Sequence, residues 1–384
     1  MQNQEVMKRK NNYNNASHIE LVKSGNAFFE KANTIIDNSK HKIHLQTYIF
    51  ADDSTGMETI SHLAAAVKRG VEVYLLVDAF GSNELKKHTI KMLEESGINF
   101  RMYSPIFSGY HIRFGRRLHH KILVSDGDEA LVGGINFDDK YHMAGHDSPW
   151  LDYAVYVTGN ICEEISIMCQ RLWSGKGYFR RKKIVISQSS SNDIHVKLQQ
   201  NDWLYGKKGI SRGLNNSIRH ANLSVTIMAS YFLPGGRIRK SLKNASKRNV
   251  KIKIILPGLS DVKLVKYATK YWYAWLLRNN IELYEWDKTI LHGKLMTMDN
   301  DHVSIGSYNI NHLSHFSSIE TNLDIKDENF CRTVKADLEN VMSQCTKITS
   351  PAKKIDFLEK FVWWSSSQLV RFLFSLQFAI LSKE

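Results

Sequence analysis

Two stretches of sequence decide the fold of this chain: RRLHHKILVSDGDEALVGGINF (116–137) and ILHGKLMTMDNDHVSIGSYNINHLS (290–314). Both contain a histidine, a lysine, an aspartate, two small residues and an asparagine at the same spacing. The matched pairs all differ by 173 positions and are His119 and His292, Lys121 and Lys294, Asp126 and Asp299, Gly133 and Gly306, Gly134 and Ser307, and Asn136 and Asn309. Six positions in one register rarely recur by chance, so the chain is an internal duplication.

Short apolar runs precede each motif in the same order, and stretches of helical periodicity separate them. These runs are KIHLQTYIF (42–50), VEVYLLVD (71–78) and INFRMY (98–103) in the first half, and LSVTIMASYF (223–232), KIKIILP (251–257) and IELYEW (281–286) in the second. Alternating strands and helices predict an α/β fold with a mixed or parallel sheet in each half. We therefore expect two similar α/β/α halves packed around a pseudo-twofold axis, followed by a C-terminal amphipathic helix.

The expected domain organisation follows from this repeat and from a change of composition in its middle. RRKKIVISQSSSND (180–193) passes from a basic run into a serine-rich stretch that is typical of a loop. The sequence predicts a disordered N-terminus over 1–17, a first domain over 18–183, a linker over 184–193, a second domain over 194–350 and a C-terminal helix over 351–384.

The composition excludes a disordered or fibrous chain, since 43% of the residues are apolar and 11% are aromatic. Lysine and arginine outnumber aspartate and glutamate by 52 to 38, and the formal charge of +14 favours anionic partners. The four cysteines show no metal-ligand spacing, and no two histidines stand at the spacing of a zinc site with suitable partners. The sequence therefore predicts neither a metal site nor another cofactor.

The residue types of the repeated motif suit phosphodiester transfer. Imidazole is a nucleophile near neutral pH, and a second imidazole can protonate the departing alkoxide. Lysine ammonium and asparagine amide groups can hold the non-bridging phosphate oxygens, which predicts a catalytic role for Lys121 and Lys294. It also predicts substrate binding by Asn136 and Asn309. Because each half alone lacks a partner histidine, we expect one active site built from both halves.

Each imidazole also needs a carboxylate that fixes its tautomer and stabilises its cation. Downstream of the motifs, WLDYAVYV (150–157) and SIETNLDI (318–325) align Asp152 with Glu320. We expect these two carboxylates to orient the two histidines.

Asp126 and Asp299 complete the motif and are counted with the catalytic residues. The plainer interpretation of these two aspartates is a structural one, in which they brace the loop after each motif strand. His120 has no support from the repeat, and we expect it on the surface or lining the site.

The duplicated motif resembles that of the phospholipase D superfamily, and the resemblance covers most of residues 18–350. Together with the two motif stretches, TYIFADD (47–53) and KRGVEVYLLVDAFGS (68–82) are similar to bacterial cardiolipin synthases, in the shorter form without N-terminal transmembrane helices. The resemblance implies phospholipase D-like halves and a phosphatidyl-histidine formed on His119. His292 would then be the general acid and base.

The same resemblance implies a substrate and a location. The expected reaction is phosphatidyl transfer from phosphatidylglycerol, which gives cardiolipin or a related phospholipid. Anionic phospholipids and the membrane surface are the expected partners, nucleic acid is not expected, and the enzyme would be peripheral at the cytoplasmic face of the cell membrane. A phospholipase D or a nuclease-type hydrolase, using the same residues with water as acceptor, remains the alternative.

The first half carries about ten residues more than the second half between its last predicted strand and its motif histidine. They lie in SPIFSGYHIRFGRRL (104–118), where apolar residues are mixed with Arg113, Arg116 and Arg117. This composition suits apolar insertion below a layer of anionic headgroups. The alternative is a loop that packs on the protein with its arginines in solvent.

The C-terminal stretch FVWWSSSQLVRFLFSLQFAILSKE (361–384) is largely apolar. Its polar stripe consists of Lys360, Ser367, Arg371, Ser375 and Ser382. An interfacial helix that lies in the membrane plane fits this pattern best, and a helix docked on the protein or a true span are the alternatives. In a separate helix over 267–275, the spacing of Tyr267, Tyr271 and Trp275 predicts a stripe that packs in the core.

Overall fold

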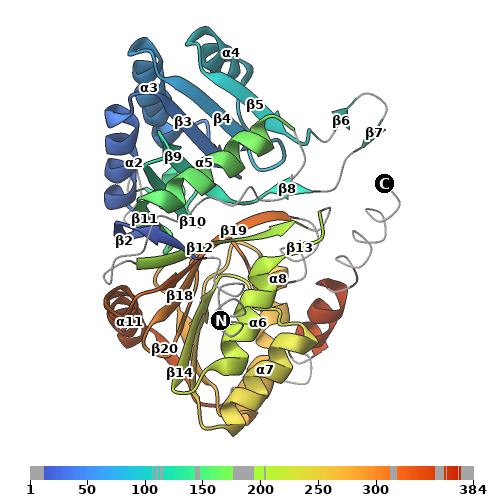
Figure 1. Cartoon of the computed structure of the whole chain (residues 1–384). Coiled ribbons are helices and arrows are strands. Elements are labelled where there is room, and N and C mark those ends of the chain that lie inside the picture. The colour runs from blue at the N-terminus through green and yellow to red at the C-terminus, as the bar shows by residue number, and fades with distance from the viewer. Residues whose placement is uncertain are drawn as a thin grey trace.

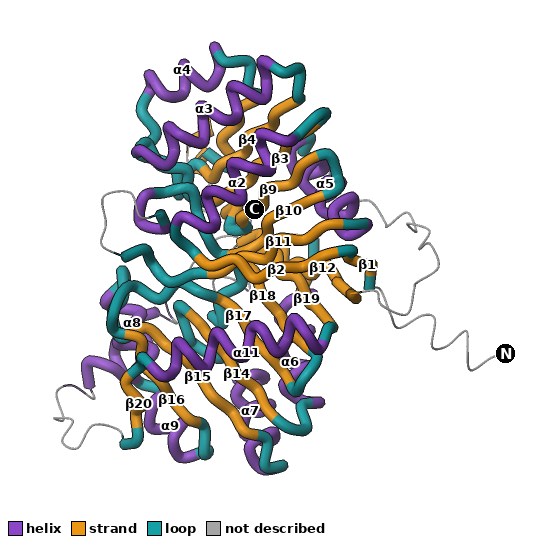
Figure 2. The backbone as a smooth tube through the Cα atoms, turned by 90° about the vertical axis from the view of Figure 1, so that its left-hand side faces the viewer, coloured by secondary structure: helices purple, strands orange, loops and turns teal. Residues whose placement is uncertain are grey.

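The computed structural model describes residues 13–105, 107–108, 111–112, 116–142, 148–175, 194–202, 205–311, 318–350, 359, 361–370 and 372. Its two halves lie one above the other in Figure 1, and each has a sheet flanked by helices. Figure 2 shows the same two halves from the side, with their strands meeting in the middle of the molecule.

The first half forms a seven-stranded mixed sheet. Its strands are β2 (His18–Lys23), β3 (Lys42–Thr47), β4 (Glu72–Asp78), β5 (Asn99–Tyr103), β9 (Lys121–Ser125), β10 (Glu129–Gly133) and β11 (Tyr153–Thr158). Their order in the sheet is β2-β11-β10-β9-β3-β4-β5. The strands β3, β4 and β5 run parallel, and the motif strand β9 joins β3 antiparallel. The helices are α2 (Asn26–Asn38), α3 (Ser54–Lys68), α4 (Lys87–Glu95), α5 (Asn160–Trp173) and the 3₁₀-helix η1 (Asp139–Tyr141).

The second half repeats this arrangement. Its strands are β12 (Ile194–Asp202), β14 (Ser224–Ala229), β15 (Lys251–Pro257), β16 (Glu282–Trp286), β17 (Lys294–Met298), β18 (His302–Gly306) and β19 (Ser318–Lys326), in the order β12-β19-β18-β17-β14-β15-β16. The helices are α6 (Gly209–His220), α7 (Gly236–Lys247), α8 (Lys263–Lys270), α9 (Tyr273–Arg278) and α11 (Glu328–Ser343). The repeated strand order confirms the prediction of two similar α/β/α halves.

Short strands join the halves and extend the second sheet. From the first half, β1 (Asn14–Ala16) pairs with β12 and β8 (Arg117–Leu118) pairs with β19. At other positions, β13 (Lys207–Lys208) pairs with β12, β20 (Thr346–Ile348) pairs with β16, and β6 (Phe107–Ser108) pairs with β7 (His111–Ile112).

The strand β1 corrects one predicted boundary. Residues 14–16 were expected in a disordered N-terminus over 1–17, but they add a strand to the unpaired edge of β12. The predicted linker over 184–193 lies outside the described residues. The remaining domain boundaries stay a prediction.

Burial explains why the motif strands are central. All five residues of β9 and four of the five residues of β10 are buried, because helices cover both faces of the sheet. One core lies between the first sheet and helices α2 and α3, and another lies between the second sheet and helices α6, α7 and α9. A third core belongs to both halves and joins Cys169 of α5 to Leu323 of β19 and Leu338 of α11. The two halves therefore form a single packed unit.

Residues 361–370 form a helix near the C-terminus that packs on the second half. Its Val370 lies in a small apolar cluster with Leu233, Ala268 and Trp272. Four positions of the predicted polar stripe, at 360, 371, 375 and 382, lie outside the described residues. Within the described part of the chain, no helix has the length and apolar character needed to cross a membrane.

Candidate active site

The motif histidines lie at the seam between the halves, just before the motif strands. His119 follows β8, and its backbone N–H donates to the carbonyl of Ile319 over 3.0 Å. In the reciprocal position, the backbone N–H of His292 donates to the carbonyl of Leu151 over 2.8 Å. Each histidine is thus fixed by the segment that leads directly into the predicted carboxylate of the other half.

Each of the two predicted carboxylates contacts the histidine of the other half. Glu320 Oε2 lies 3.0 Å from Nδ1 of His119, and Asp152 Oδ2 lies 2.6 Å from Nδ1 of His292. Both carboxylates are fully buried, whereas 17% of the His119 side chain and 9% of the His292 side chain are exposed. Because a carboxylate accepts from Nδ1–H, Nε2 is the ring nitrogen left to meet a substrate.

Lys121 and Lys294 lie buried beside the histidines. The Lys121 ammonium donates to the carbonyl of His119 over 2.7 Å. The Lys294 ammonium donates to the carbonyl of His292 and lies 3.7 Å from Asp152 Oδ2. Burial and the charge of Lys294 lower the pKa of Lys121 to about 7, and burial also lowers the pKa of Lys294. A phosphate anion between the two would favour their charged forms, so the pair suits an anionic substrate.

Both motif imidazoles also have a lowered pKa. Burial is the largest cause for His119, and Glu320 opposes it. Burial and the charge of Lys294 lower the pKa of His292 to about 4, against the opposing effect of Asp152. Neutral imidazole is the nucleophilic form, so both rings carry an available lone pair at neutral pH. A ring that serves as the acid must gain a proton when an anionic substrate binds beside the lysines.

The motif asparagines are both buried and hydrogen-bonded. Asn309 Oδ1 accepts from the Ser230 hydroxyl over 2.6 Å. Asn136 Oδ1 accepts from a backbone N–H just after β3 over 3.1 Å, and its amide donates to the Tyr141 hydroxyl over 2.9 Å. That hydroxyl lies 3.2 Å from Nδ1 of His292. Asn136 of the first half is therefore linked to the histidine of the second half.

Asp126 and Asp299 are not part of this cluster, which corrects their place among the catalytic residues. They follow β9 and β17 at the ends farther from the histidines, with φ values of 53° and 48°. Asp126 accepts from the backbone N–H groups of residues 40–42, and Asp299 accepts from those of residues 222–224. Each aspartate therefore braces the turn after its motif strand against the start of β3 or β14.

One motif position differs between the halves because the two carboxylates differ. A Cβ at Gly134 would lie 2.4 Å from Asp152 Oδ1, so this carboxylate fills the space that a side chain would need. At the matching position, the Ser307 hydroxyl donates to Glu320 Oε2 over 2.5 Å. Gly134 thus makes room for Asp152, and Ser307 helps to hold Glu320.

Aromatic side chains that sequence reasoning did not assign surround the histidines. The ring of Tyr48 stands edge-on to His119, with 5.0 Å between the ring centroids. The rings of Tyr141 and Trp150 lie 5.4 Å and 6.0 Å from that of His292. Tyr48 lies within the predicted strand over 42–50 and Trp150 is the first residue of WLDYAVYV, but no spacing in the sequence connects either with the motif.

Arg116 and Arg117 point into the protein, so for these two residues both the prediction of headgroup contact and its solvated alternative are wrong; Arg113 lies outside the described residues. Arg116 donates to both carboxylate oxygens of Asp202, over 3.1 Å and 2.6 Å. The Arg117 guanidinium lies 3.5 Å from Asp78, which also accepts from the backbone N–H of Leu118 over 2.7 Å. Because both aspartates are buried, these contacts anchor β8 just before the first histidine.

His120 is also corrected, since it is buried and joins the halves. Its Nε2 lies 2.9 Å from Gln46 Oε1, and its Nδ1 lies 3.2 Å from Thr321 Oγ1. Burial, followed by the charge of Lys121, lowers its pKa to about 3. His120 is therefore a neutral structural residue at neutral pH.

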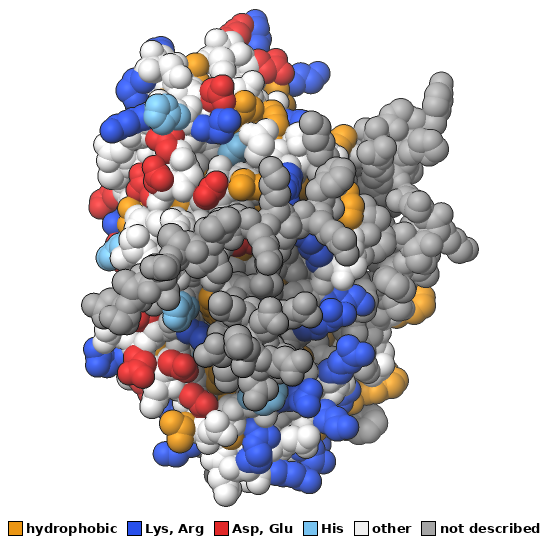
Figure 3. Space-filling view, in the orientation of Figure 1, with side chains coloured by type: hydrophobic (Ala, Val, Ile, Leu, Met, Phe, Trp, Pro, Cys, Tyr) orange, Lys and Arg blue, Asp and Glu red, His pale blue; other side chains and the backbone are white. Residues whose placement is uncertain are grey.

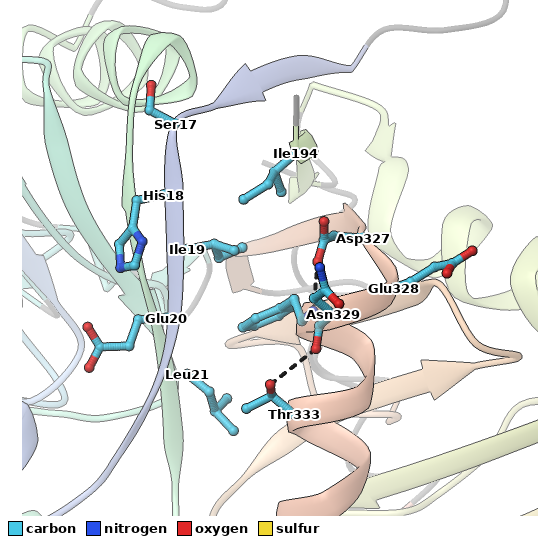
Figure 4. A pocket seen from close by; sticks show the side chains of 11 residues that line it. Ser17, His18, Ile19, Glu20, Leu21, Ile194, Asp327, Glu328, Asn329 and Thr333 are labelled. Carbon is cyan, nitrogen blue, oxygen red and sulfur yellow. Dashed lines mark hydrogen bonds between the residues drawn. The ribbon is translucent and has the colours of Figure 1, made fainter. Parts of the chain in front are cut away.

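A separate pocket lies between β2 and the start of α11 (Figure 4). The described residues that line it include the acidic Asp327 and Glu328 and no lysine or arginine, while the side chain of Glu20 points away from it (Figure 4). A phosphate anion is disfavoured beside these carboxylates, so the seam with its two histidines and two lysines is the candidate active site.

The fold and this reciprocal arrangement of histidines, lysines and carboxylates define a two-half enzyme of the phospholipase D superfamily. The sequence matches the family described as cardiolipin synthase, PLD-like domain, over residues 33–173 and 214–342, and the chain belongs to that family. It is similar to cardiolipin synthase B of Escherichia coli (strain K12), with 28% identity over 361 residues that cover 92% of this chain and 86% of that protein. A probable cardiolipin synthase of Bacillus subtilis (strain 168) is 26% identical over 348 residues, which cover 88% and 68%.

Solved structures share the fold at lower identity. Phosphatidylserine synthase of Haemophilus influenzae Rd KW20 has a TM-score of 0.74 at 13% identity, covering 98% of this chain and 99% of that one. Polyphosphate kinase from Porphyromonas gingivalis has a TM-score of 0.59 at 15% identity, covering 93% and 54%. These likenesses concern the fold alone. The family match, with its cardiolipin synthase relatives, identifies the chain as a phosphatidyltransferase of the phospholipase D superfamily.

Proposed function

We propose that this enzyme transfers a phosphatidyl group from phosphatidylglycerol to a second glycerol-headed lipid and so makes cardiolipin or a related phospholipid. The observation that carries the proposal is the pair of histidines at the seam, each held by the carboxylate of the other half. The cardiolipin synthases among its relatives support this choice of donor and product.

In the first step, Nε2 of His119 attacks the donor phosphorus and the bond from phosphorus to the headgroup oxygen breaks. Glu320 stabilises the positive charge that forms on His119. Protonated His292, stabilised by Asp152, gives its Nε2 proton to the departing alkoxide. The products are a phosphatidyl-histidine and free glycerol. The assignment of nucleophile and acid follows the order of the superfamily.

In the second step, the same groups act in reverse. His292, now neutral, takes the proton from the hydroxyl of the acceptor lipid while that oxygen attacks phosphorus. The bond from phosphorus to Nε2 of His119 breaks, and His292 ends the cycle with the proton of the acceptor hydroxyl, which replaces the proton that it gave in the first step. One histidine thus serves as acid and then as base, which explains why both must lie in one site.

The phosphate itself would be held by the remaining motif residues. Lys121 and Lys294 bring two positive charges to the non-bridging oxygens, and the amides of Asn136 and Asn309 add hydrogen-bond donors. With both lysines buried, these interactions act in a medium of low dielectric constant, where they are strong. We expect turnover without an added divalent metal.

We further propose that the enzyme is peripheral and works on anionic phospholipids at the cytoplasmic face of the cell membrane. Its formal charge of +14 supports attraction to an anionic surface. A lipid surface around the site would also limit the access of water to the phosphatidyl-histidine, which favours a lipid hydroxyl as acceptor.

Product analysis tests this function. Purified full-length protein is incubated with vesicles that contain labelled phosphatidylglycerol, the lipids are separated by thin-layer chromatography, and a DNA digestion assay runs beside it. Labelled cardiolipin is expected. Phosphatidic acid as the only product would favour a phospholipase D, and DNA digestion without lipid turnover would favour a nuclease.

A further inference from the structure

The helix over 361–370 docks with its polar side toward the protein. Ser366 and Ser367 are 6% and 2% exposed, and Val370 packs with Trp272. The small serine side chains let the helix approach the second half closely. Its outward side, extended to residue 372, carries Phe361, Val362, Trp364, Leu369 and Phe372, each between 37% and 60% exposed. This is the reverse of a helix that covers the core of a soluble protein.

Further exposed apolar side chains stand on the loop over 258–262 and on α8, the helix whose Ala268 packs in one cluster with Val370 of the C-terminal helix. Leu259, Val262 and Tyr267 are 43%, 40% and 39% exposed, so the core stripe predicted for this helix is wrong at Tyr267. We call these three residues and the five outward residues of the C-terminal helix the docking face. Of thirteen large apolar side chains that stand exposed in the described part of the chain, eight belong to it. Such a concentration marks an interaction surface, whereas single exposed apolar residues are ordinary.

Three residues of the docking face, Leu259, Val262 and Tyr267, lie in a strongly basic part of the chain. Residues 236–278, which span α7, α8 and α9, hold twelve lysines and arginines and one acidic residue, Asp261. Lys263, Lys266 and Lys270 recur on α8 at helical spacing. In Figure 3, blue lysine and arginine side chains gather over the lower part of the molecule, where Figure 1 places α7 and α8. Apolar side chains beside many cations suit an anionic lipid surface.

Short contacts connect the docking face with the active site. Asp261, in the loop before α8, accepts from the Tyr231 hydroxyl, which lies 2.9 Å and 2.7 Å from its two carboxylate oxygens. Tyr231 directly follows Ser230, which donates to the motif residue Asn309. The strand before them, β14, ends opposite Lys294 of the motif strand. The loop that carries Leu259 and Val262 is therefore joined to the motif residues at one end of the neighbouring interior strands β14 and β17.

We propose that the docking face binds the surface of an anionic bilayer. The C-terminal helix and the loop with Leu259 and Val262 would enter the apolar layer, and the lysines of α8 would stand at the level of the headgroups. The inference rests on the proposed function and names the surface through which the enzyme reaches its lipids. A second copy of the chain is a poorer occupant, because two basic faces repel one another.

Vesicle flotation of the full chain tests this surface. The vesicles contain phosphatidylglycerol with phosphatidylcholine, or phosphatidylcholine alone. The variants are Trp364→Glu with Leu369→Glu, and Leu259→Glu with Val262→Glu. Each double variant should lower binding to the anionic vesicles by about tenfold or more, because it removes apolar contact and adds two negative charges. The matched control is Leu223→Glu, which changes a 57% exposed leucine outside the docking face and should leave flotation unchanged.

Two further measurements separate the possible outcomes. Turnover of a soluble short-chain phosphodiester should stay within about twofold in all variants, because the substituted side chains are exposed and belong to neither motif. Light scattering should give the same molecular mass for all of them. Unchanged flotation of both double variants, an equal loss in the Leu223→Glu control, or a change of mass in place of flotation would overturn the docking face. A wild-type enzyme that floats through this face but makes no transfer product would instead refute the proposed function.

Discussion

Replacing Gly134 with alanine should lower the activity, because the new side chain displaces the carboxylate of Asp152. The new Cβ would lie 2.4 Å from Asp152 Oδ1, whereas ordinary contact begins at 3.4 Å, so the carboxylate must move by about 1 Å. Asp152 Oδ2 now lies 2.6 Å from His292 Nδ1. A shift of that size takes it to about 3.6 Å, which is beyond a hydrogen bond. The imidazole then loses the group that fixes its tautomer and stabilises its cation.

The size of the effect follows from this displacement. A misplacement of 1 Å in a catalytic arrangement costs about 10²-fold, and loss of the orienting carboxylate of a triad costs about 10⁴-fold. We therefore expect the kcat of Gly134→Ala to fall by about 10² to 10⁴. The matched control is Ser307→Ala, which removes one hydrogen bond to Glu320 and creates no overlap. A bond worth about 0.5–1.5 kcal/mol limits its effect to about tenfold.

The assay is phosphatidyl transfer by both purified variants, with thermal unfolding followed by circular dichroism. Overpacking a buried position destabilises by about 1–3 kcal/mol, so the Gly134→Ala protein should melt earlier but remain folded at the assay temperature. A folded Gly134→Ala enzyme with wild-type turnover would refute the steric reasoning. Equal losses in the two variants would also contradict it.

The remaining predictions concern the histidines and the bracing aspartates. His119→Ala and His292→Ala should each remove nearly all turnover. An alkaline quench with phosphorus-labelled donor should trap the label on His119, and label on His292 would make that residue the nucleophile and His119 the acid and base. Asp126→Ala and Asp299→Ala should each lower the free energy of unfolding, measured in denaturant, by about 1–3 kcal/mol, while the folded proteins keep their turnover. A loss of turnover at unchanged stability would show that these residues act in the reaction. Burial lowers the pKa of His120 from 6.5 to about 3, so the unfolded chain binds more protons between these values and the free energy of unfolding should fall as the pH drops through them. His120→Gln should flatten that part of the stability curve, and an unchanged slope would show that other groups cause it.

Much of the site could be predicted from local patterns. His119 and Lys121 are two positions apart at the start of an apolar run, and this spacing puts both side chains on one side of a strand. The interval of 173 residues then repeats the arrangement, so a second histidine and lysine were expected in the same site. Asp152 and Glu320 could be paired because each follows its motif at a matching place. All of these inferences depend on short segments, whose geometry is set by the backbone itself.

The pairing of each carboxylate with its histidine could not be predicted in this way. The alignment of Asp152 with Glu320 does not say which carboxylate serves which histidine, because the contacts join residues 140 and 201 positions apart. The same holds for Arg117, whose charge suggested a lipid headgroup until the fold placed Asp78 beside it.

The sequence by itself determined two α/β halves, one site between them and the residue types that act there, since the periodicity and the repeat are properties of the chain. Tertiary packing decided the rest. It placed Asp126 at the end of its strand that is farther from the histidines, and it paired each carboxylate with the histidine of the other half. It also placed Ser367 of the polar stripe against the protein, while Trp364 is exposed. The physical reason is that a side chain's partner depends on which surfaces of distant segments exclude water together, and no local pattern encodes that choice.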